Sequence, residues 1–263
     1  SVGNGAFKYC SSLEKIDLSM CTSVSSNAFY SCSSLRSIGN PKLTSIPDNA
    51  FYGCSSLEKI DLSMCTTVGS DAFYGCSKLQ NVNISNCTYI GYSAFNGCSS
   101  ITEVDLSACK NLGISAFDGC KKLENVIGLE NYKSIPSCAF RQTALKSVDL
   151  PVCTTIGGSA FSGCSSLQSV DLPVCTTIGY SAFYGCSGLQ SVNLPKVESI
   201  GNNVFGGSGI SKVSLPATLK SMGYQCFDNV KEYTFNGTQP AVLTEQLSSE
   251  SYNNHPAFSG ASY

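Results

Sequence analysis

Hydrophobic and polar positions along this chain follow a pattern that repeats about every 22 residues. A phenylalanine marks each repeat, and these marker residues are Phe7, Phe29, Phe51, Phe73, Phe95, Phe117, Phe140, Phe161, Phe183, Phe205 and Phe227. The spacing is 22 residues except beside Phe140, where it is 23 and then 21. A fixed period of this length is typical of repeat proteins, whose units bury their apolar faces against one another.

The copy that begins at Phe51 shows which elements to expect. Its apolar positions are Phe51, Cys54, Leu57, Ile60, Leu62, Cys65, Val68 and Ala72. Residues 57–62 end in a period-2 alternation, which predicts a short strand with one buried face. Residues 68–69 predict a second extended piece, and residues 72–75 a tight helical turn. We therefore expect stacked coils that each add one strand to a single continuous parallel sheet.

The motif from Leu57 to Cys76 resembles a known repeat. It reads Leu-x-x-Ile-x-Leu-x-x-Cys-x-x-Val-Gly-x-x-Ala-Phe-x-x-Cys and is similar to the BspA-like, or treponemal, leucine-rich repeat. The resemblance implies a right-handed leucine-rich-repeat solenoid of the α/β repeat class, rich in β-structure, with short helical turns. It also implies a non-enzymatic protein, bacterial in most cases, that is secreted or displayed on the cell surface and serves adhesion and protein binding.

The repeat divides the chain into two parts. Residues 1–236 are expected to form a solenoid of about eleven 22-residue coils. The pattern breaks after Phe235 and revives at Ala257-Phe258, so residues 237–263 are expected to form an irregular C-terminal unit with an insertion, cut short at Tyr263. Because the chain starts inside a repeat, we interpret it as a fragment of a longer protein.

Composition narrows the functional classes. The formal net charge is -2 and charged residues make up 13% of the chain. Nucleic-acid binding needs a basic face, so this balance argues against it. The sequence has no run of about 18 apolar residues that could insert into a membrane. We expect a monomer that binds no cofactor.

Sixteen cysteines raise the question of metal binding, disulfides or packing. Metal is excluded on spacing, because no C-x-x-C occurs and the sequence has one histidine, His255. Disulfides between equivalent positions of neighbouring coils would need Cβ atoms closer than the coil spacing gives, so buried thiols are favoured over bridges. Cys138 stands outside the two cysteine columns, in an otherwise polar column, and is expected to be the exposed thiol.

The exposed side of the strand is the favoured binding surface. Its polar side chains form a ladder across the coils, and we take as candidate ligand-binding residues Glu58, Lys59, Asp61, Asn83, Asp105, Asp149, Asp171 and Asn193. The expected partner is a protein or an extracellular-matrix component, with a glycan as second choice. A purely solvated strand face is an equally good interpretation of the same residues.

Two further interpretations stay open. A turn-face patch of Tyr30, Tyr52 and Tyr74 offers aromatic contact area, although capping of the turns is the favoured interpretation of these residues. The protein could also be a spacer that presents another domain. A glycan-active enzyme using strand-face carboxylates is a remote alternative, because a flat strand surface lacks the cleft that separates the pKa values of paired carboxyls.

Overall fold

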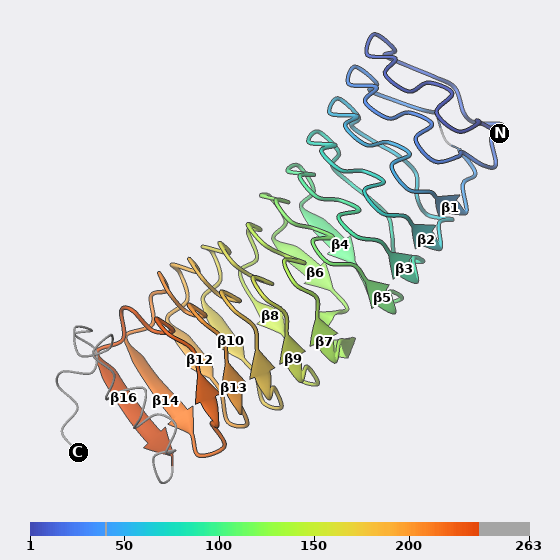
Figure 1. The fold of residues 1–263 in the computed structure, drawn as a ribbon. Coiled ribbons are helices and arrows are strands. Elements are labelled where there is room, and N and C mark those ends of the chain that lie inside the picture. Colours follow the sequence, from blue (N-terminus) through green and yellow to red (C-terminus); the bar gives the residue numbers. More distant parts are fainter. Residues whose placement is uncertain (40, 237–263) are drawn as a thin grey trace. The chain divides into compact units, whose positions relative to one another are not determined.

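The computed structural model describes residues 1–39 and 41–236 and divides into two compact units (Figure 1). Unit 1 comprises Ser1–Gly128 and Cys138–Ala144, and unit 2 comprises Leu129–Ser137 and Leu145–Tyr263. In each unit, successive coils stack with their strands parallel and in register, which confirms the predicted β-solenoid. Residues 237–263, for which we expected an irregular terminal unit, lie outside the described residues.

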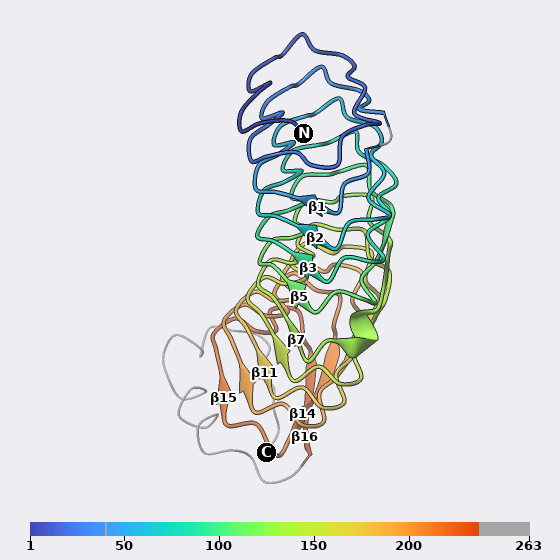
Figure 2. The same cartoon turned by 90° about the vertical axis from the view of Figure 1, so that its right-hand side faces the viewer.

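Unit 1 has two parallel ladders. The longer one contains β1 (Ser45–Ile46), β2 (Thr67–Val68), β3 (Tyr89–Ile90) and β5 (Asn111–Leu112), in that order. These strands lie one after another along one side of the unit (Figure 2). The second ladder pairs β4 (Glu103–Asp105) with β6 (Asn125–Ile127).

Unit 2 has three parallel ladders. The five-stranded ladder follows the order β15-β13-β11-β9-β7, and the others are β12-β10-β8 and β14-β16. The bounds of these strands are β7 (Ser134–Ile135), β8 (Val148–Asp149), β9 (Thr155–Ile156), β10 (Ser169–Asp171), β11 (Thr177–Ile178), β12 (Ser191–Asn193), β13 (Ser199–Ile200), β14 (Lys212–Pro216), β15 (Ser221–Met222) and β16 (Glu232–Asn236).

The prediction of one continuous sheet was wrong. A regular coil contributes two separate extended segments, such as β10 and β11, and these join different ladders. The strand-face ladder is also interrupted. In unit 1 it consists of the β4–β6 pair and an isolated bridge between Lys15 and Ser37, and residues 57–62, where we predicted a strand, form none.

The segment around each marker phenylalanine is a hydrogen-bonded turn. In the Phe51 copy, the Tyr52 amide donates to the Asn49 carbonyl at 3.2 Å and the Cys54 amide donates to the Phe51 carbonyl at 3.1 Å. In the described part of the chain, the helical segment is the 3-10 helix η1 (Leu129–Asn131). The short helical turns are therefore not confirmed, and the right-handed sense of the coils stays a prediction.

The marker phenylalanines form the core of each unit. Within unit 1, consecutive rings from Phe7 to Phe140 stack with centroids 5.2 to 5.9 Å apart and planes within 7° of parallel. Within unit 2, the stack from Phe161 to Phe227 has spacings of 5.4, 5.5 and 5.0 Å. Because every coil offers its ring at the same place, the stack within each unit passes from one coil to the next.

Buried thiols support this core. The Cys54 and Cys76 thiols each donate to the carbonyl of the marker phenylalanine 25 residues earlier, with Sγ–O distances of 3.1 Å. Burial raises the pKa of the Cys65 thiol to about 11 and that of Cys87 to about 12. These side chains therefore act as small apolar residues with one weak donor, as the spacing indicated.

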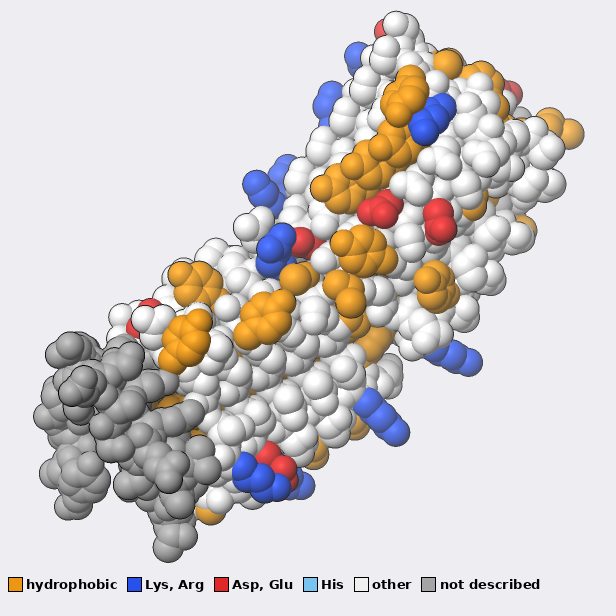
Figure 3. All heavy atoms as spheres, in the orientation of Figure 1, with side chains coloured by type: hydrophobic (Ala, Val, Ile, Leu, Met, Phe, Trp, Pro, Cys, Tyr) orange, Lys and Arg blue, Asp and Glu red, His pale blue; other side chains and the backbone are white. Residues whose placement is uncertain are grey.

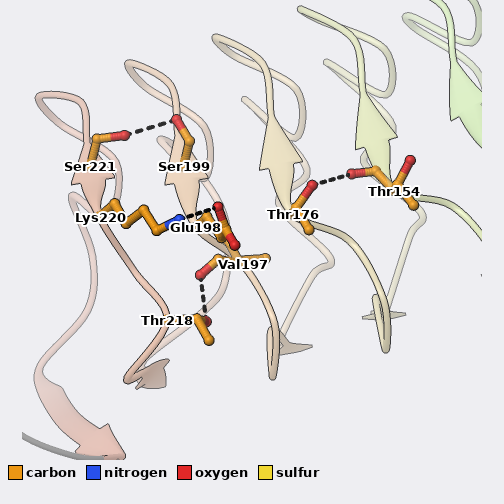
Figure 4. A network of polar contacts seen from close by, with 8 residues as sticks. All are labelled: Thr154, Thr176, Val197, Glu198, Ser199, Thr218, Lys220 and Ser221. Atoms are coloured by element: carbon orange, nitrogen blue, oxygen red, sulfur yellow. Dashed lines mark hydrogen bonds and ion pairs between the residues drawn. The ribbon is translucent and has the colours of Figure 1, made fainter.

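Polar side chains tie the coils together at the surface. In unit 2, the Thr176 hydroxyl donates to the Thr154 carbonyl at 3.2 Å, and the Lys220 ammonium binds the Glu198 carboxylate at 2.8 Å (Figure 4). The same view shows the Ser199–Ser221 and Val197–Thr218 contacts. Equivalent positions in neighbouring coils thus bind each other, not just the solvent.

Two positions in each regular coil have a left-handed backbone. One lies two residues after the marker and is glycine in many copies, including Gly53, Gly75, Gly97 and Gly119. The other lies two residues before the marker, with φ between 49° and 57°, and holds Asn27, Asn49, Asp71, Ser93, Ser115, Cys138, Ser159, Ser181, Asn203 and Gln225. Asn, Asp and Gly tolerate this conformation best, which explains the small polar residues in the column.

Candidate functional site

The structure brings three of the candidate strand-face residues together in unit 2. Asp149 lies opposite Asp171 in the β8–β10 ladder, and Asp171 lies opposite Asn193 in the β10–β12 ladder. All three side chains are exposed. The Asn193 amide donates to the Asp171 carboxylate at 2.9 Å, so the row presents two adjacent carboxylates and one oriented amide.

In unit 1 the equivalent side chains bind their own backbone. The Asp61 carboxylate accepts from the Ser63 amide at 2.9 Å, and the Asp105 carboxylate accepts from the Ser107 amide at 2.8 Å. The Asn83 side-chain oxygen accepts from the Ser85 hydroxyl at 2.8 Å. Side-chain and backbone hydrogen bonds from Ser63 lower the pKa of Asp61 below its usual range. These turns orient the side chains and use part of their acceptor capacity.

A single position explains this difference between the units. The residue two places after the aspartate is serine in unit 1, whereas in unit 2 it is Pro151 after Asp149 and Pro173 after Asp171. Proline has no N–H to donate, so the turn bond seen at Asp61 cannot form at Asp149 or Asp171. The signal for this difference is the change from Asp-Leu-Ser triplets in unit 1 to Asp-Leu-Pro triplets in unit 2.

A shallow depression lies on the strand face of unit 1. It has a volume of ≈ 360 Å³ and is lined by Asn81, Val82, Asn83, Ile84, Ser85, Glu103, Val104, Asp105 and Ile127. Ile127 is 47% exposed and lies opposite Asp105 in the β4–β6 ladder. Sequence reasoning included Asn83 and Asp105 but missed Glu103 and Ile127. The sequence did hold a signal for this site, because Ile127 is an aliphatic residue in a column of otherwise mostly polar residues.

The other two strand-face candidates, Glu58 and Lys59, are exposed in the coil that contains Asp61. The Glu58 amide donates to the Arg36 carbonyl at 3.3 Å, which keeps this segment in register with the preceding coil. These residues share a face with the depression-lining column, but neither lines the depression itself.

The turn-face tyrosines form a stacked column in unit 1. The Tyr30 and Tyr52 rings lie 4.6 Å apart and the Tyr52 and Tyr74 rings 4.8 Å apart, with planes within 4° of parallel. The Lys8 ammonium lies over the Tyr30 ring at 4.8 Å. A row of hydrophobic side chains crosses the coils of this unit (Figure 3). The rings therefore cover one another's faces and expose mainly their edges and hydroxyls.

The same column ends in a charged contact. Arg141 binds Asp118 through two hydrogen bonds, and Asp118 is only 4% exposed. The Asn96 amide also reaches Asp118, at 3.5 Å. From Lys8 to Arg141, the polar and aromatic groups of this column are thus engaged with their neighbours in adjacent coils.

Cys138 is of intermediate exposure, as is Cys21, while Cys10 is exposed. Cys138 also has a φ of 55°, so it occupies the left-handed position that holds Asn, Asp or Ser in most other coils. Our expectation that it is the exposed thiol was based on the polarity of that column. The residues of this column are polar because small polar side chains tolerate the left-handed backbone, not because the column is fully exposed. A partly buried thiol therefore fits there.

The described residues offer little for catalysis or metal binding. Asp149 and Asp171 are both exposed, so neither has the desolvated environment of a general acid. Within residues 1–39 and 41–236, no three His, Cys, Asp or Glu side chains gather closely enough to hold a metal ion. His255 lies outside those ranges. In the same part of the chain, no helix has the length and apolar character needed to cross a membrane.

Comparison with known proteins adds solved structures of the same fold. A leucine-rich repeat protein from Bacteroides ovatus is 21% identical, with a TM-score of 0.58 over 97% of this chain and 86% of that one. A leucine-rich cell surface protein from Faecalibacterium prausnitzii is 17% identical, with a TM-score of 0.53 over 92% and 87%. The pneumococcal vaccine antigen PcpA is 20% identical, with a TM-score of 0.58 over 84% and 61%.

The comparison with curated proteins found no match to this sequence. The model of the BspA type leucine rich repeat region, which spans six copies, matches residues 1–124 and 110–234. These ranges cover nearly all the coils described above and include both the stacked phenylalanines and the thiol columns. The chain therefore belongs to the family of BspA-type leucine-rich repeat proteins.

Proposed function

We propose that this protein is a recognition module, secreted or displayed on a cell surface, that binds a protein or an extracellular-matrix component through its strand face. Leucine-rich repeat proteins are in general protein-interaction scaffolds, and no catalytic family matches the chain. Two similar structures are described as a cell surface protein and a vaccine antigen, which supports the surface location.

The observation that carries the choice of face is the row Asp149, Asp171 and Asn193. Its carboxylates are exposed, aligned by the ladder and deprived by proline of the backbone donor that their unit 1 equivalents bind. On the turn face of unit 1, by contrast, the aromatic and charged groups are occupied by one another. The exposed carboxylates of Asp149 and Asp171 therefore keep acceptor capacity that a partner can use.

The depression beside Ile127 supports the same face in unit 1. It combines an exposed aliphatic side chain with the carboxylates of Glu103 and Asp105. A partner surface that pairs an apolar side chain with a basic one would fit it. Such sites are shallow, so affinity comes from several modest contacts spread over neighbouring coils.

Biolayer interferometry against a panel of purified matrix and serum proteins tests the proposal. The variant Asp149→Asn/Asp171→Asn should weaken binding about tenfold, since loss of two exposed interfacial charges costs roughly 1–2 kcal/mol. A matched control, Ser165→Lys/Ser187→Lys, changes the net charge equally at exposed sites after the cysteine column. Equal loss in both variants would indicate nonspecific charge effects. A protein that binds nothing on the panel or on host cells would be a spacer.

A further inference from the structure

A second hollow lies on the turn face of unit 2. Its volume is ≈ 350 Å³, and it is lined by Ser181, Tyr184, Asn203, Gly206, Gln225 and Asp228. These six residues come from three successive coils and from just two positions in the repeat. Ser181, Asn203 and Gln225 each precede a marker phenylalanine by two residues, and Tyr184, Gly206 and Asp228 each follow one directly.

The hollow exists because Gly206 has no side chain. The equivalent positions in unit 1 hold Tyr52 and Tyr74, whose rings fill the space between coils. A Cβ atom on Gly206 would come within 3.1 Å of the Tyr184 ring. Gly206 is not among the glycines with positive φ, so its backbone does not require glycine. The missing side chain instead leaves room beside Tyr184.

Tyr184 is consequently an aromatic ring with open surface. It is 51% exposed, and no other ring of the described residues stacks on it. A ring in this situation can pack against the apolar face of a ligand, whereas Tyr52 has both faces covered by Tyr30 and Tyr74.

Polar groups surround this ring in a fixed arrangement. Both Asp228 oxygens accept from the Gly207 amide, at 3.0 and 2.9 Å, and each retains acceptor capacity. Ser181, Asn203 and Gln225 share a left-handed backbone with φ of 52°, 55° and 51°. The Ser181 and Asn203 amides bind carbonyls of the next coil, so the side chains are the groups left for a ligand.

We propose that this hollow binds one pyranose ring of a glycan. A pyranose has an apolar C–H face that packs on an aromatic ring and equatorial hydroxyls that both donate and accept. Asp228 can accept from them, whereas Asn203 and Gln225 offer donors and acceptors together. The carboxylate, with no basic residue in the lining, disfavours phosphates and other anions. The site is separate from the strand face, and its ligand belongs to a different class.

The size of the hollow sets the expected affinity. A methyl hexopyranoside has about 13 non-hydrogen atoms, and at the efficiency of ordinary small ligands it should bind with a Kd of about 1 mM. Saturation-transfer NMR detects binding in this range. The probes are the methyl glycosides of glucose, galactose, mannose and N-acetylglucosamine, with sorbitol as an open-chain polyol that has no apolar ring face.

Two variants test the geometry from opposite directions. Tyr184→Ala removes the aromatic surface, and Gly206→Tyr fills the hollow and recreates the stack of unit 1. Both should reduce saturation transfer at least tenfold, and circular dichroism checks that Gly206→Tyr still folds, because its Cβ atom requires the Tyr184 ring to shift. Tyr52→Ala, in the closed column of unit 1, is the control and should leave the transfer unchanged.

The proposal predicts that at least one pyranoside binds to the wild type and that sorbitol does not. Absence of transfer to all four pyranosides, or equal transfer in wild type and Gly206→Tyr, would overturn it. Should Gly206→Tyr fail to fold, Tyr184→Ala and Gln225→Ala decide, because both change exposed side chains. Unchanged transfer in these two variants would place the sugar elsewhere and refute the site.

Discussion

Arg141 holds Asp118 in a bidentate pair that joins two neighbouring coils of unit 1. The Arg141 Nε lies 2.9 Å from one Asp118 oxygen and its Nη2 lies 2.8 Å from the other. The Asp118 side chain is 6% exposed, whereas that of Arg141 is 46% exposed. A nearly buried carboxylate thus depends on a cation that reaches it from the solvent side.

Removal of this cation should destabilise unit 1 measurably. Arg141→Ala leaves the buried Asp118 charge without its main partner, and we expect a loss of about 1–3 kcal/mol in the free energy of unfolding. Urea denaturation followed by circular dichroism measures it. The exposed Lys220–Glu198 pair provides the contrast, since Lys220→Ala should cost under about 0.5 kcal/mol. Equal effects of the two substitutions would contradict the role assigned to burial.

The phenylalanine stack predicts a larger loss. Phe73 is fully buried, and its ring lies 5.4 Å from that of Phe51 and 5.2 Å from that of Phe95. Phe73→Ala should therefore cost about 3–5 kcal/mol, because the cavity is shared by coils that cannot close around it. Tyr74→Ala, one residue later and exposed, is the matched control and should cost roughly 1 kcal/mol or less. A small loss for Phe73→Ala would mean that the coils can repack.

The repeat spacing predicted the stacking of the coils, whereas the short strands were harder to predict. The 22-residue spacing of Phe51 and Phe73 required stacking, and the structure confirms it. The strand predicted for residues 57–62 does not form in that coil, although the equivalent positions form β4 (Glu103–Asp105) and β10 (Ser169–Asp171) in later coils. The second extended piece predicted at residues 68–69 corresponds to β2 (Thr67–Val68), but a piece this short gave no sign that it would form a ladder of its own, so the division into several sheets was missed.

The candidate surfaces were harder to predict, because they depend on the partners of each side chain. Composition cannot distinguish Asp61, which binds the Ser63 amide, from Asp171, which precedes a proline by two residues. It also cannot distinguish the stacked Tyr52 from the open Tyr184 without the residue in the next coil, Tyr74 or Gly206. In this solenoid, whether a surface side chain is free to contact a partner depends on the residue at the equivalent position of the next coil, 22 residues away.

The left-handed column gives a third prediction. Ser115 has a φ of 56° and is one of the non-glycine residues there. Ser115→Gly should leave stability unchanged or raise it by up to about 1 kcal/mol, because glycine adopts this conformation without steric cost. Ser115→Val should lower it by about 1–2 kcal/mol, since a β-branched residue disfavours positive φ. Thermal unfolding of the two variants measures the difference, and the opposite order would exclude backbone strain as the reason for this column.

The buried thiols give the fourth prediction, a loss of stability at alkaline pH. Burial raises the pKa of Cys65 from its ordinary value of 9.0 to about 11 and that of Cys87 to about 12. Above pH 9 the unfolded chain therefore releases thiol protons that the folded chain retains, and the free energy of unfolding falls as the pH rises towards 11 and 12. Below pH 9 both states hold these protons, so the contribution is complete there.

Urea denaturation at several pH values between 8 and 11 tests this directly. Each buried thiol can contribute a slope of up to about 1.4 kcal/mol per pH unit, so Cys65→Ala/Cys87→Ala should flatten the alkaline decline by a measurable amount. Ser165→Ala, at an exposed position and without loss of a thiol, should leave the slope as in the wild type. Lysines and tyrosines also titrate in this range, but they are common to all three proteins and cancel in the comparison. Identical slopes in the wild type and the double variant would show that these thiols ionise as easily in the folded chain as in the unfolded one.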